Sequence, residues 1–233
     1  MTAGTVLAVV DLQNDFCAGP VAQARFGGDP AVLEAVVAGG VRAVAQARRH
    51  GVEVVFVRFV GDPGHQGASW RRRDRAQGKR PKCLEGSWGA RFRGPQPGPG
   101  DAVFTKRARF DAFLADGFEA HLRARGAGHL VLAGLYADVC VDTTARTAFQ
   151  KGWHVTVLTD CTTALHLPYE TVLRFMRTCY GARTLTADDP AAWTPPPDHD
   201  HDHDPHSDPA PAPAPAPAPA REEEPCPSPT ARP

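Results

Sequence analysis

The sequence lacks the closely spaced cysteine pairs that mark structural zinc sites. Its six cysteines are scattered over 233 residues, and no two of them form a Cys-x-x-Cys pair. Neither a zinc knuckle nor a disulfide framework is therefore indicated. We expect most of these cysteines to be free thiols, any of which could be reactive: Cys17, Cys83, Cys140, Cys161, Cys179 and Cys226.

The sequence also lacks an excess of either charge and any long apolar run. Lysine and arginine together number 26, as do aspartate and glutamate. This balance gives no support for capture of nucleic acid or an anionic membrane, and it favours a small, neutral or mixed-charge partner. The apolar stretch from Val6 to Val10 is too short to span a bilayer and lacks the basic start of a signal peptide. We therefore expect a cytoplasmic protein that binds neither membranes nor nucleic acid.

Short apolar runs alternate with helical patterns through most of the chain. With 42% hydrophobic residues, the sequence can form one α/β domain with a substantial core. Strands are predicted at residues 5–11, 52–59, 102–106, 129–133, 154–160 and 183–187. Helices are predicted at residues 30–50, 111–125, 139–151 and 169–180. This alternation predicts a three-layer αβα domain with a mainly parallel sheet of about six strands.

Two segments depart from this alternation. Residues 61–100 are rich in Gly, Pro and Arg without clear periodicity, so we expect a long loop, which in a compact domain is more often functional than idle. After Trp193 the composition changes to alternating His and Asp, followed by an Ala-Pro repeat. We expect residues 1–193 to form the domain and residues 194–233 to form a disordered tail. The sequence leaves open whether the His/Asp part of this tail binds a metal or a partner.

Three chemically distinctive side chains stand where predicted strands end. Asp11 and Lys106 end the first and third strands, and a turn after the fourth strand leads to Cys140 at a helix start. Ligands of parallel sheets bind at the strands' carboxyl ends, so we expect these residues to end neighbouring strands and their side chains to converge. The N–H groups of a helix start are expected to lower the pKa of Cys140, and they can hold an oxyanion. From the pattern alone, structural roles are equally open: packing for Cys140, capping for Asp11 and a solvated strand end for Lys106.

The residues around these positions carry a family resemblance. The start VVDLQNDFCAG, the lysine after the strand AVFT, and the stretch GLYADVCVDTTARTAFQKGWHVTVLTDCTTAL resemble the isochorismatase-like cysteine hydrolases. This superfamily includes nicotinamidases, N-carbamoylsarcosine amidases and ureidoacrylate amidohydrolases. The resemblance covers residues 5–189, with the motifs in the family's order and spacing, and it implies the same α/β fold.

The resemblance implies a catalytic triad with a role for each member. Asp11 would take the thiol proton from Cys140 and later serve as acid and base, while Lys106 would hold the charge of the network. Cys140 would attack an amide carbonyl, the amine would leave, and water would hydrolyse the thioester. The chain would then be a hydrolase acting on carbon-nitrogen bonds other than peptide bonds.

The resemblance also implies an oxyanion hole and parts of a substrate pocket. Backbone N–H groups of Tyr136 and Cys140 would hold the oxyanion, beside a cis peptide between Leu135 and Tyr136. Phe16, Trp88 and Tyr136 are the candidate substrate-binding residues. The family commonly forms dimers or tetramers, so we expect a homo-oligomer.

Departures from the family's sequence patterns narrow the range of expected substrates. Nicotinamidases carry an Asp-x-His metal cluster after the second strand, but here Asp62 and His65 are spaced differently, with no second histidine nearby. We therefore expect no metal and no other cofactor. True isochorismatases hydrolyse a vinyl ether and lack the cysteine, so Cys140 opposes that chemistry, although the turn from Gly134 to Ala137 resembles theirs.

The leading hypothesis is a metal-independent amidohydrolase that cleaves a C–N amide bond of a small molecule. The bond can be linear or cyclic, and a lactam of a natural product is included because streptothricin hydrolase is one metal-free member of the family. Three alternatives stay open: a vinyl-ether hydrolase of the isochorismatase type, a nicotinamidase, and a non-catalytic binding protein of the same fold.

Overall fold

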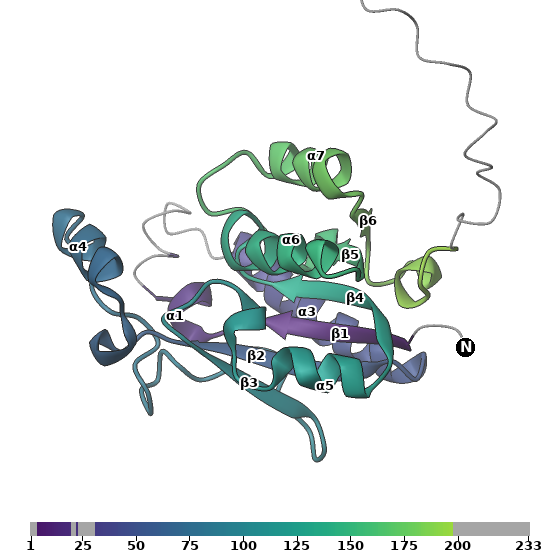
Figure 1. Ribbon diagram of the computed structural model, residues 1–233, viewed down its shortest axis with the longest axis horizontal. Coiled ribbons are helices and arrows are strands. Elements are labelled where there is room, and N and C mark those ends of the chain that lie inside the picture. The colour runs from purple at the N-terminus through teal and green to yellow at the C-terminus, as the bar shows by residue number, and fades with distance from the viewer. Residues whose placement is uncertain (1–3, 20–21, 23–30, 198–233) are drawn as a thin grey trace, which may run out of the picture. The chain divides into compact units, whose positions relative to one another are not determined.

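The short apolar runs of the sequence form one parallel sheet (Figure 1). The structure is a computed structural model and describes residues 4–19, 22 and 31–197. Within these residues the sheet has six strands in the order β3-β2-β1-β4-β5-β6, and every neighbouring pair runs parallel. The strands are β1 (Gly4–Val10), β2 (Glu53–Val60), β3 (Ala102–Arg107), β4 (Ala127–Gly134), β5 (His154–Leu158) and β6 (Arg183–Leu185).

Helices cover both faces of this sheet, which confirms the predicted three-layer αβα fold (Figure 1). Because successive strand side chains point to opposite faces, Val6, Ala8 and Val10 of β1 join the core under α5, α6 and α7. Leu7 and Val9 join the core under α3. The helices are α1 (Asn14–Cys17), α3 (Ala31–Arg49), α4 (Ala68–Ala76), α5 (Phe118–Ala124), α6 (Asp142–Gln150) and α7 (Tyr169–Tyr180).

The strand order places a topological switch between β1 and β4. The chain runs from β1 through α3 to β2 and β3 on one side, then returns to β4 on the other side of β1. Loops that leave β1 and β4 in opposite directions open a crevice at their carboxyl ends, where ligands of such sheets bind. Asp11 follows β1 and the segment leading to Cys140 follows β4, so both leave the sheet at this crevice.

Two predicted helices are shorter than the sequence pattern indicates. The prediction of a helix over 111–125 is wrong at its start, where a 3₁₀ turn (Ala112–Leu114) precedes α5. Gly117 separates the two with a φ of 79°, a left-handed conformation that ends regular helix. The helix predicted from residue 139 instead begins as a π-helical turn (Ala137–Val141) that continues into α6.

The predicted loop at 61–100 contains structure that the sequence pattern did not indicate. A 3₁₀ turn (Pro63–His65) leads into α4. No residue of α4 is fully buried, so this helix lacks the apolar stripe by which helices are predicted. It joins the domain through Trp70, whose ring lies against Phe59 and Phe110.

Trp193 packs against the domain near the end of the described residues. Its ring is buried, stacks on His50, and donates from Nε1 to the carbonyl of Ala187 at 3.1 Å. The predicted boundary after residue 193 stays a prediction, because nearly all of the predicted tail, including its His/Asp run, lies outside the described residues. In the described part of the chain, no helix combines the length and apolar character needed to cross a membrane.

Candidate active site

Asp11 and Lys106 form a fully buried ion pair. Nζ of Lys106 lies 2.7 Å from Oδ2 of Asp11, and neither side chain is exposed to solvent. The same Nζ donates to the carbonyl oxygen of Phe110 at 2.7 Å. Removing two charges from water costs several kcal/mol per ion, so a pair without solvent persists only with good geometry and further hydrogen bonds. A buried ion pair of this kind contributes little net stability to the fold, so its presence indicates a chemical role.

The strand order corrects one detail of the sequence prediction. We expected the three candidate residues to end neighbouring strands, but β2 lies between β1, which precedes Asp11, and β3, which carries Lys106. The Asp11 N–H donates to Val57 of β2 at 2.8 Å. Lys106 is paired in register with Phe59 of β2, so its long side chain is what brings its charge to Asp11.

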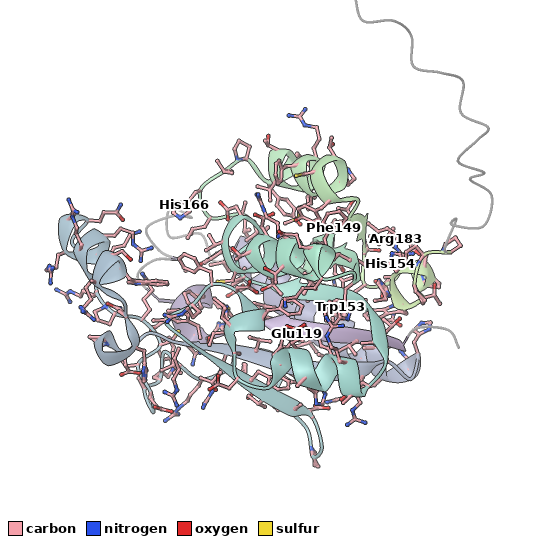
Figure 2. All side chains as sticks on the ribbon, viewed as in Figure 1. Glu119, Phe149, Trp153, His154, His166 and Arg183 are labelled. Atoms are coloured by element: carbon pink, nitrogen blue, oxygen red, sulfur yellow. The ribbon has the colours of Figure 1, made fainter. Side chains whose placement is uncertain are left out.

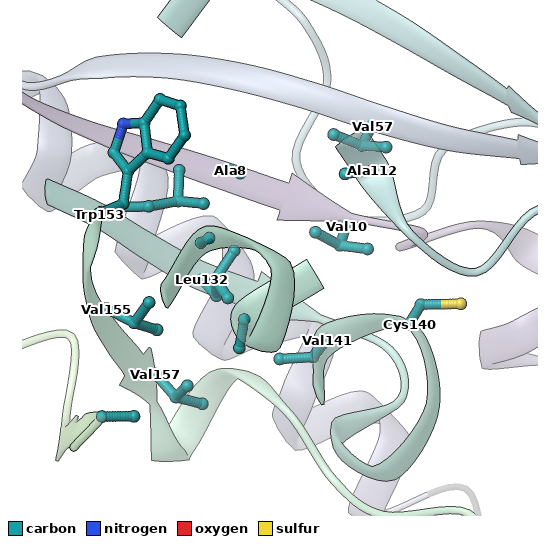
Figure 3. Packing of buried hydrophobic residues seen from close by; sticks show 14 of the residues in the cluster. Ala8, Val10, Val57, Ala112, Leu132, Cys140, Val141, Trp153, Val155 and Val157 are labelled. Carbon is teal, nitrogen blue, oxygen red and sulfur yellow. The ribbon is translucent and has the colours of Figure 1, made fainter. Parts of the chain in front are cut away.

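Cys140 lies beside this pair, at the edge of the apolar core (Figure 3). The thiol interacts with both Asp11 and Lys106. The side chain is 6% exposed and lines a pocket, whereas Asp11 and Lys106 are not among the residues that line it. The predicted convergence of the three side chains is therefore found, and of the three only Cys140 lines the pocket.

Burial dominates the protonation of this cluster. It raises the pKa of Cys140 well above that of a free thiol, with Lys106 opposing and Asp11 reinforcing the shift. Burial also raises the pKa of Asp11, while the charge of Lys106 opposes that shift. For Lys106, burial alone would lower the pKa, but the neighbouring Asp11 and Cys140 raise it overall. Among the described residues, Oδ1 of Asp11 has no partner with good hydrogen-bond geometry.

The expectation that a helix start lowers the pKa of Cys140 was wrong in its net direction. The residue occupies a π-helical turn and is almost completely buried, and the loss of hydration raises the pKa of the thiol despite its place near a helix start. The resting residue is therefore a thiol that needs a proton acceptor before it can act as a nucleophile.

Tyr136 stands where the turn after β4 enters the π-helical segment. The Leu135-Tyr136 peptide bond is cis, as the family resemblance implied. The carbonyl of Tyr136 accepts from the N–H groups of Val139 and Val141 at 3.0 and 3.1 Å, which fixes the turn around Cys140. Its hydroxyl donates to the carbonyl of Phe16 at 2.5 Å.

Aromatic rings form much of the pocket wall. The pocket measures about 150 Å³, a size suited to a small molecule. Its rings contact one another in series. The ring centroid of Phe16 lies 6.2 Å from that of Tyr136 and 5.8 Å from that of Phe59. The ring centroid of Trp70 lies 6.2 Å from that of Phe59 and 4.7 Å from that of Phe110. Phe16 and Tyr136 therefore line the pocket as predicted.

The structure does not bring Trp88 into this pocket. Its side chain is 53% exposed and it is not among the lining residues. Trp70 of α4 supplies the tryptophan instead. Trp70 was not predicted because its segment resembles an irregular loop, in which a single aromatic residue among polar ones was the only signal.

The loop that carries Trp88 is nonetheless tied to the turn after β1. Gln13 donates from Nε2 to the carbonyls of Phe59 and Ala90, both at 2.9 Å, and its Oε1 accepts from the Phe59 N–H at 2.7 Å. Asp15 accepts from the N–H of Cys83 at 2.6 Å. These polar contacts hold α1 and Phe16 against the pocket, and Asp15 supports the turn after β1.

Asp62 and His65 follow β2, where nicotinamidases carry their metal cluster, and both make other contacts. Asp62 accepts from the N–H of Glu85 at 3.1 Å, and His65 lies 2.9 Å from Nη1 of Arg107. Within the described ranges, no group of three or more His, Cys, Asp or Glu side chains is arranged to hold a metal ion.

Comparisons with known proteins identify the family of the chain. A family model described as the isochorismatase domain matches residues 5–189. The chain is 30% identical over 174 residues to ureidoacrylate amidohydrolase RutB of Variovorax paradoxus, covering 68% of each chain. It is 32% identical over 193 residues to the RutB of Methylorubrum extorquens strain AM1, covering 76% of this chain and 77% of that protein.

A solved structure has a similar fold. N-carbamoylsarcosine amidase from Thermoplasma acidophilum superimposes with a TM-score of 0.67 at 26% identity, covering 80% of this chain and 98% of the other. The family match spans all of the described sheet except Gly4, together with Asp11, Lys106 and Cys140. The chain therefore belongs to the isochorismatase domain family.

Proposed function

We propose that this chain hydrolyses a C–N amide bond of a small molecule through a thioester on Cys140. The amidohydrolases to which it is similar support the reaction class. The observation that carries the proposal is the buried cluster: a thiol open to the pocket, backed by a carboxylate and an ammonium that are themselves excluded from solvent.

The first half of the reaction moves one proton and exchanges one bond. The Asp11 carboxylate accepts the Cys140 proton, and the sulfur attacks the carbonyl carbon to give a tetrahedral oxyanion. Asp11, now protonated, gives its proton to the departing nitrogen as the C–N bond breaks. Amine and thioester result, and Asp11 is again a carboxylate beside Lys106.

The second half returns the enzyme to its starting state. Water attacks the thioester while Asp11 accepts a water proton, and collapse of the tetrahedral intermediate breaks the C–S bond. The sulfur regains its proton from Asp11 and the carboxylic acid leaves. Lys106 stays protonated throughout and stabilises the carboxylate form of Asp11, which fits its direction of pKa shift and its fixed contact with the Phe110 carbonyl.

The oxyanion is assigned to the backbone N–H groups of Tyr136 and Cys140, as the family resemblance implies. Both residues line the pocket, and Cys140 lies in the turn that the Tyr136 carbonyl organises. Phe16 and Tyr136 are assigned to substrate binding on the same ground. The proposal needs no metal or other cofactor, because each proton and charge is carried by these side chains.

An amide panel with intact-mass detection tests the proposal. Wild-type protein is mixed with carbamoyl compounds, ureidoacrylate-like amides, nicotinamide and lactams, with and without a chelator. We expect an acyl adduct on Cys140 during turnover, no effect of chelator, and no hydrolysis or adduct in Cys140→Ala. Hydrolysis at the wild-type rate by Cys140→Ala would overturn the mechanism. Release of pyruvate from isochorismate would instead favour the vinyl-ether alternative.

Location and assembly form a second part of the proposal. The five cysteines within the described residues are free, four of them buried, which fits a reducing compartment such as the cytoplasm.

We propose a homo-oligomer, a dimer or tetramer, because apolar side chains such as Phe149 and Phe175 are 49% and 40% exposed. Light scattering coupled to gel filtration checks the assembly, and a monomer would contradict it.

A further inference from the structure

The stretch of chain after β3 carries the second hydrogen-bond acceptor of Lys106. Residues 108–111 lie outside regular helix and strand, and Ala108 has a left-handed φ of 49°. The Phe110 carbonyl, which accepts from Nζ of Lys106 at 2.7 Å, therefore stands beyond the last residue of β3 that pairs with β2. The Phe110 ring packs on Trp70 at the pocket. Other contacts must fix the carbonyl itself if it is to hold the ammonium in place.

Asp111, the next residue, fastens this stretch to the helix that follows Cys140. Its side chain is buried, and Oδ1 accepts from the N–H of Phe113 at 2.9 Å, which caps a 3₁₀ turn (Ala112–Leu114). Its Oδ2 accepts from the hydroxyl of Thr147 at 2.6 Å. Both oxygens of the carboxylate are thus engaged, and one of them holds α6.

Two threonines of α6 that meet this stretch share one face of the helix. Thr144 is fully buried and accepts from the N–H of Ala112 at 3.1 Å. Thr147 comes three residues later, so it lies on the same side. The π-helical turn that contains Cys140 runs directly into α6. The nucleophile and the contact with Asp111 therefore belong to one continuous helical segment.

The far end of α6 is joined to the domain by contacts that do not involve Phe110. Nζ of Lys151 lies 2.7 Å from Glu119 of α5, and the rings of Trp153 and Phe113 have centroids 5.3 Å apart. In Figure 2 the side chains of Glu119 and Trp153 lie between α5 and α6. The ion pair between Lys151 and Glu119 thus anchors the same helix but leaves the Phe110 carbonyl untouched.

We propose that Asp111 is a positioning residue for the lysine of the cluster. Held by Thr147, it fixes the Phe110 carbonyl. That carbonyl in turn keeps the ammonium of Lys106 at a set distance from the Asp11 carboxylate. This inference rests on the proposed amide hydrolysis and adds to it a residue outside the pocket lining.

The charge of Lys106 acts on both of its partners, so its position can be measured. Burial raises the pKa of Asp11 and that of Cys140, and the charge of Lys106 opposes both shifts. Cys83 is a further titratable group near Asp11, where burial raises the pKa of its thiol and the Asp11 charge reinforces the shift. The main charge effects on the cluster come from its own members. A displaced ammonium would therefore raise the pKa of both partners, whereas loss of the charge of Asp111 alone would not.

Variants of Asp111 in the full-length protein separate positioning from charge. Asp111→Ala loses both contacts, so the acid limb of kcat/KM should move up by about 0.5–1 pH unit. Its kcat should fall by about 10- to 100-fold with KM little changed, as expected for a misplaced group. Asp111→Asn keeps an acceptor for the Phe113 N–H and an amide that can donate to Thr147, so its limb should stay at the wild-type pH.

The position of the acid limb excludes a merely structural role, which would lower activity equally at every pH. Circular dichroism checks that each variant is folded. An unmoved limb in folded Asp111→Ala would overturn the proposal. Equal movement in Asp111→Asn would assign the effect to charge and overturn it as well.

The threonine contact gives a second test with a smaller change of shape. Thr147→Val removes the hydroxyl and should move the limb upward, whereas Thr147→Ser keeps it and should retain the wild-type limb. Lys151→Gln breaks the ion pair with Glu119 and serves as the matched control, with no movement expected. Equal movement in Lys151→Gln, or in Thr147→Ser, would contradict a specific role of the contact with Asp111.

A labelling experiment separates this proposal from amide hydrolysis if no amide is cleaved. Iodoacetamide labelling of Cys140 is followed against pH in the Cys179→Ser background, with peptide mapping. Because Lys106 opposes the rise in the pKa of the Cys140 thiol, labelling in Asp111→Ala should need a higher pH than in Asp111→Asn or the parent. Such a shift would support the positioning role even when the reaction fails, and coinciding profiles would overturn it.

Discussion

Lys106 lies 2.7 Å from Asp11 in a space closed to solvent, and the Cys140 thiol contacts this pair from the pocket side. The arrangement separates two tasks: the accessible sulfur meets the substrate, and the buried carboxylate handles protons without competition from water. The pKa directions of the three groups lead to the first predictions.

Replacing the proton acceptor should abolish turnover while the fold persists. Asp11→Asn keeps the side-chain volume but removes the base, so kcat should fall by about 10²- to 10⁴-fold. Steady-state assays on the best amide of the panel measure this. Asp142→Asn, which alters another buried carboxylate bonded to Tyr180 and Arg146, is the control and should retain most activity. Near wild-type kcat in Asp11→Asn would remove Asp11 from the mechanism.

The acid limb of the pH profile of kcat/KM should lie at a pH above the usual pKa range of an aspartate. Burial raises the pKa of Asp11, and the protonated form cannot accept the thiol proton, so kcat/KM falls as pH drops through that raised pKa. Lys106 opposes the shift, so Lys106→Met should move the acid limb to still higher pH. Circular dichroism checks that the variant is folded. An unchanged or lowered limb would contradict the electrostatic role of Lys106.

Alkylation should report the protonation and burial of Cys140. Iodoacetamide should modify the exposed Cys179 first, so the experiment is run in Cys179→Ser. In that background, inactivation should be slow at neutral pH and should accelerate as pH rises, because burial raises the pKa of the thiol. Peptide mapping locates the adduct. Fast, pH-independent labelling of Cys140 would indicate a resting thiolate instead.

Two tryptophans near the pocket should differ in their effect on substrate binding. Trp70→Ala removes a ring that packs on Phe59 and Phe110, and KM should rise by up to roughly tenfold, in line with loss of about 0.5–1.5 kcal/mol of aromatic contact. Trp88→Ala, at a half-exposed position outside the lining, should change KM little. A larger rise in KM for Trp88→Ala than for Trp70→Ala would instead support Trp88 as a pocket residue, as the sequence predicted.

Close packing at Gly89 should make the loop after Cys83 sensitive to one methyl group. A Cβ at Gly89 would overlap the Asp15 carboxylate, which accepts from the Cys83 N–H. Gly89→Ala should therefore lower the free energy of unfolding by about 1–3 kcal/mol, as overpacking typically does. Denaturant titration measures the change. Gly64→Ala, with open space around its Cβ, is the control, and equal stability of the two variants would contradict this packing.

The sequence determined the elements whose side chains repeat with a regular period. The apolar run Val6 to Val10 predicted β1, since its alternate residues fill the two cores on either side of the sheet. The turn before Cys140 and the positions of Asp11 and Lys106 predicted their convergence, because the carboxyl ends of parallel strands share one edge. Helix α4 escaped prediction because its single apolar anchor, Trp70, gives no periodic signal.

Tertiary structure decided the properties that depend on distant neighbours. Trp88 was expected in the pocket and Trp70 was found there, because the choice depends on which loop packs against Phe59. The pKa of Cys140 is raised rather than lowered, because surrounding segments remove water from the thiol despite its place near a helix start. Local pattern fixes elements and their ends, whereas burial and charge environment arise only when segments far apart in the chain come together.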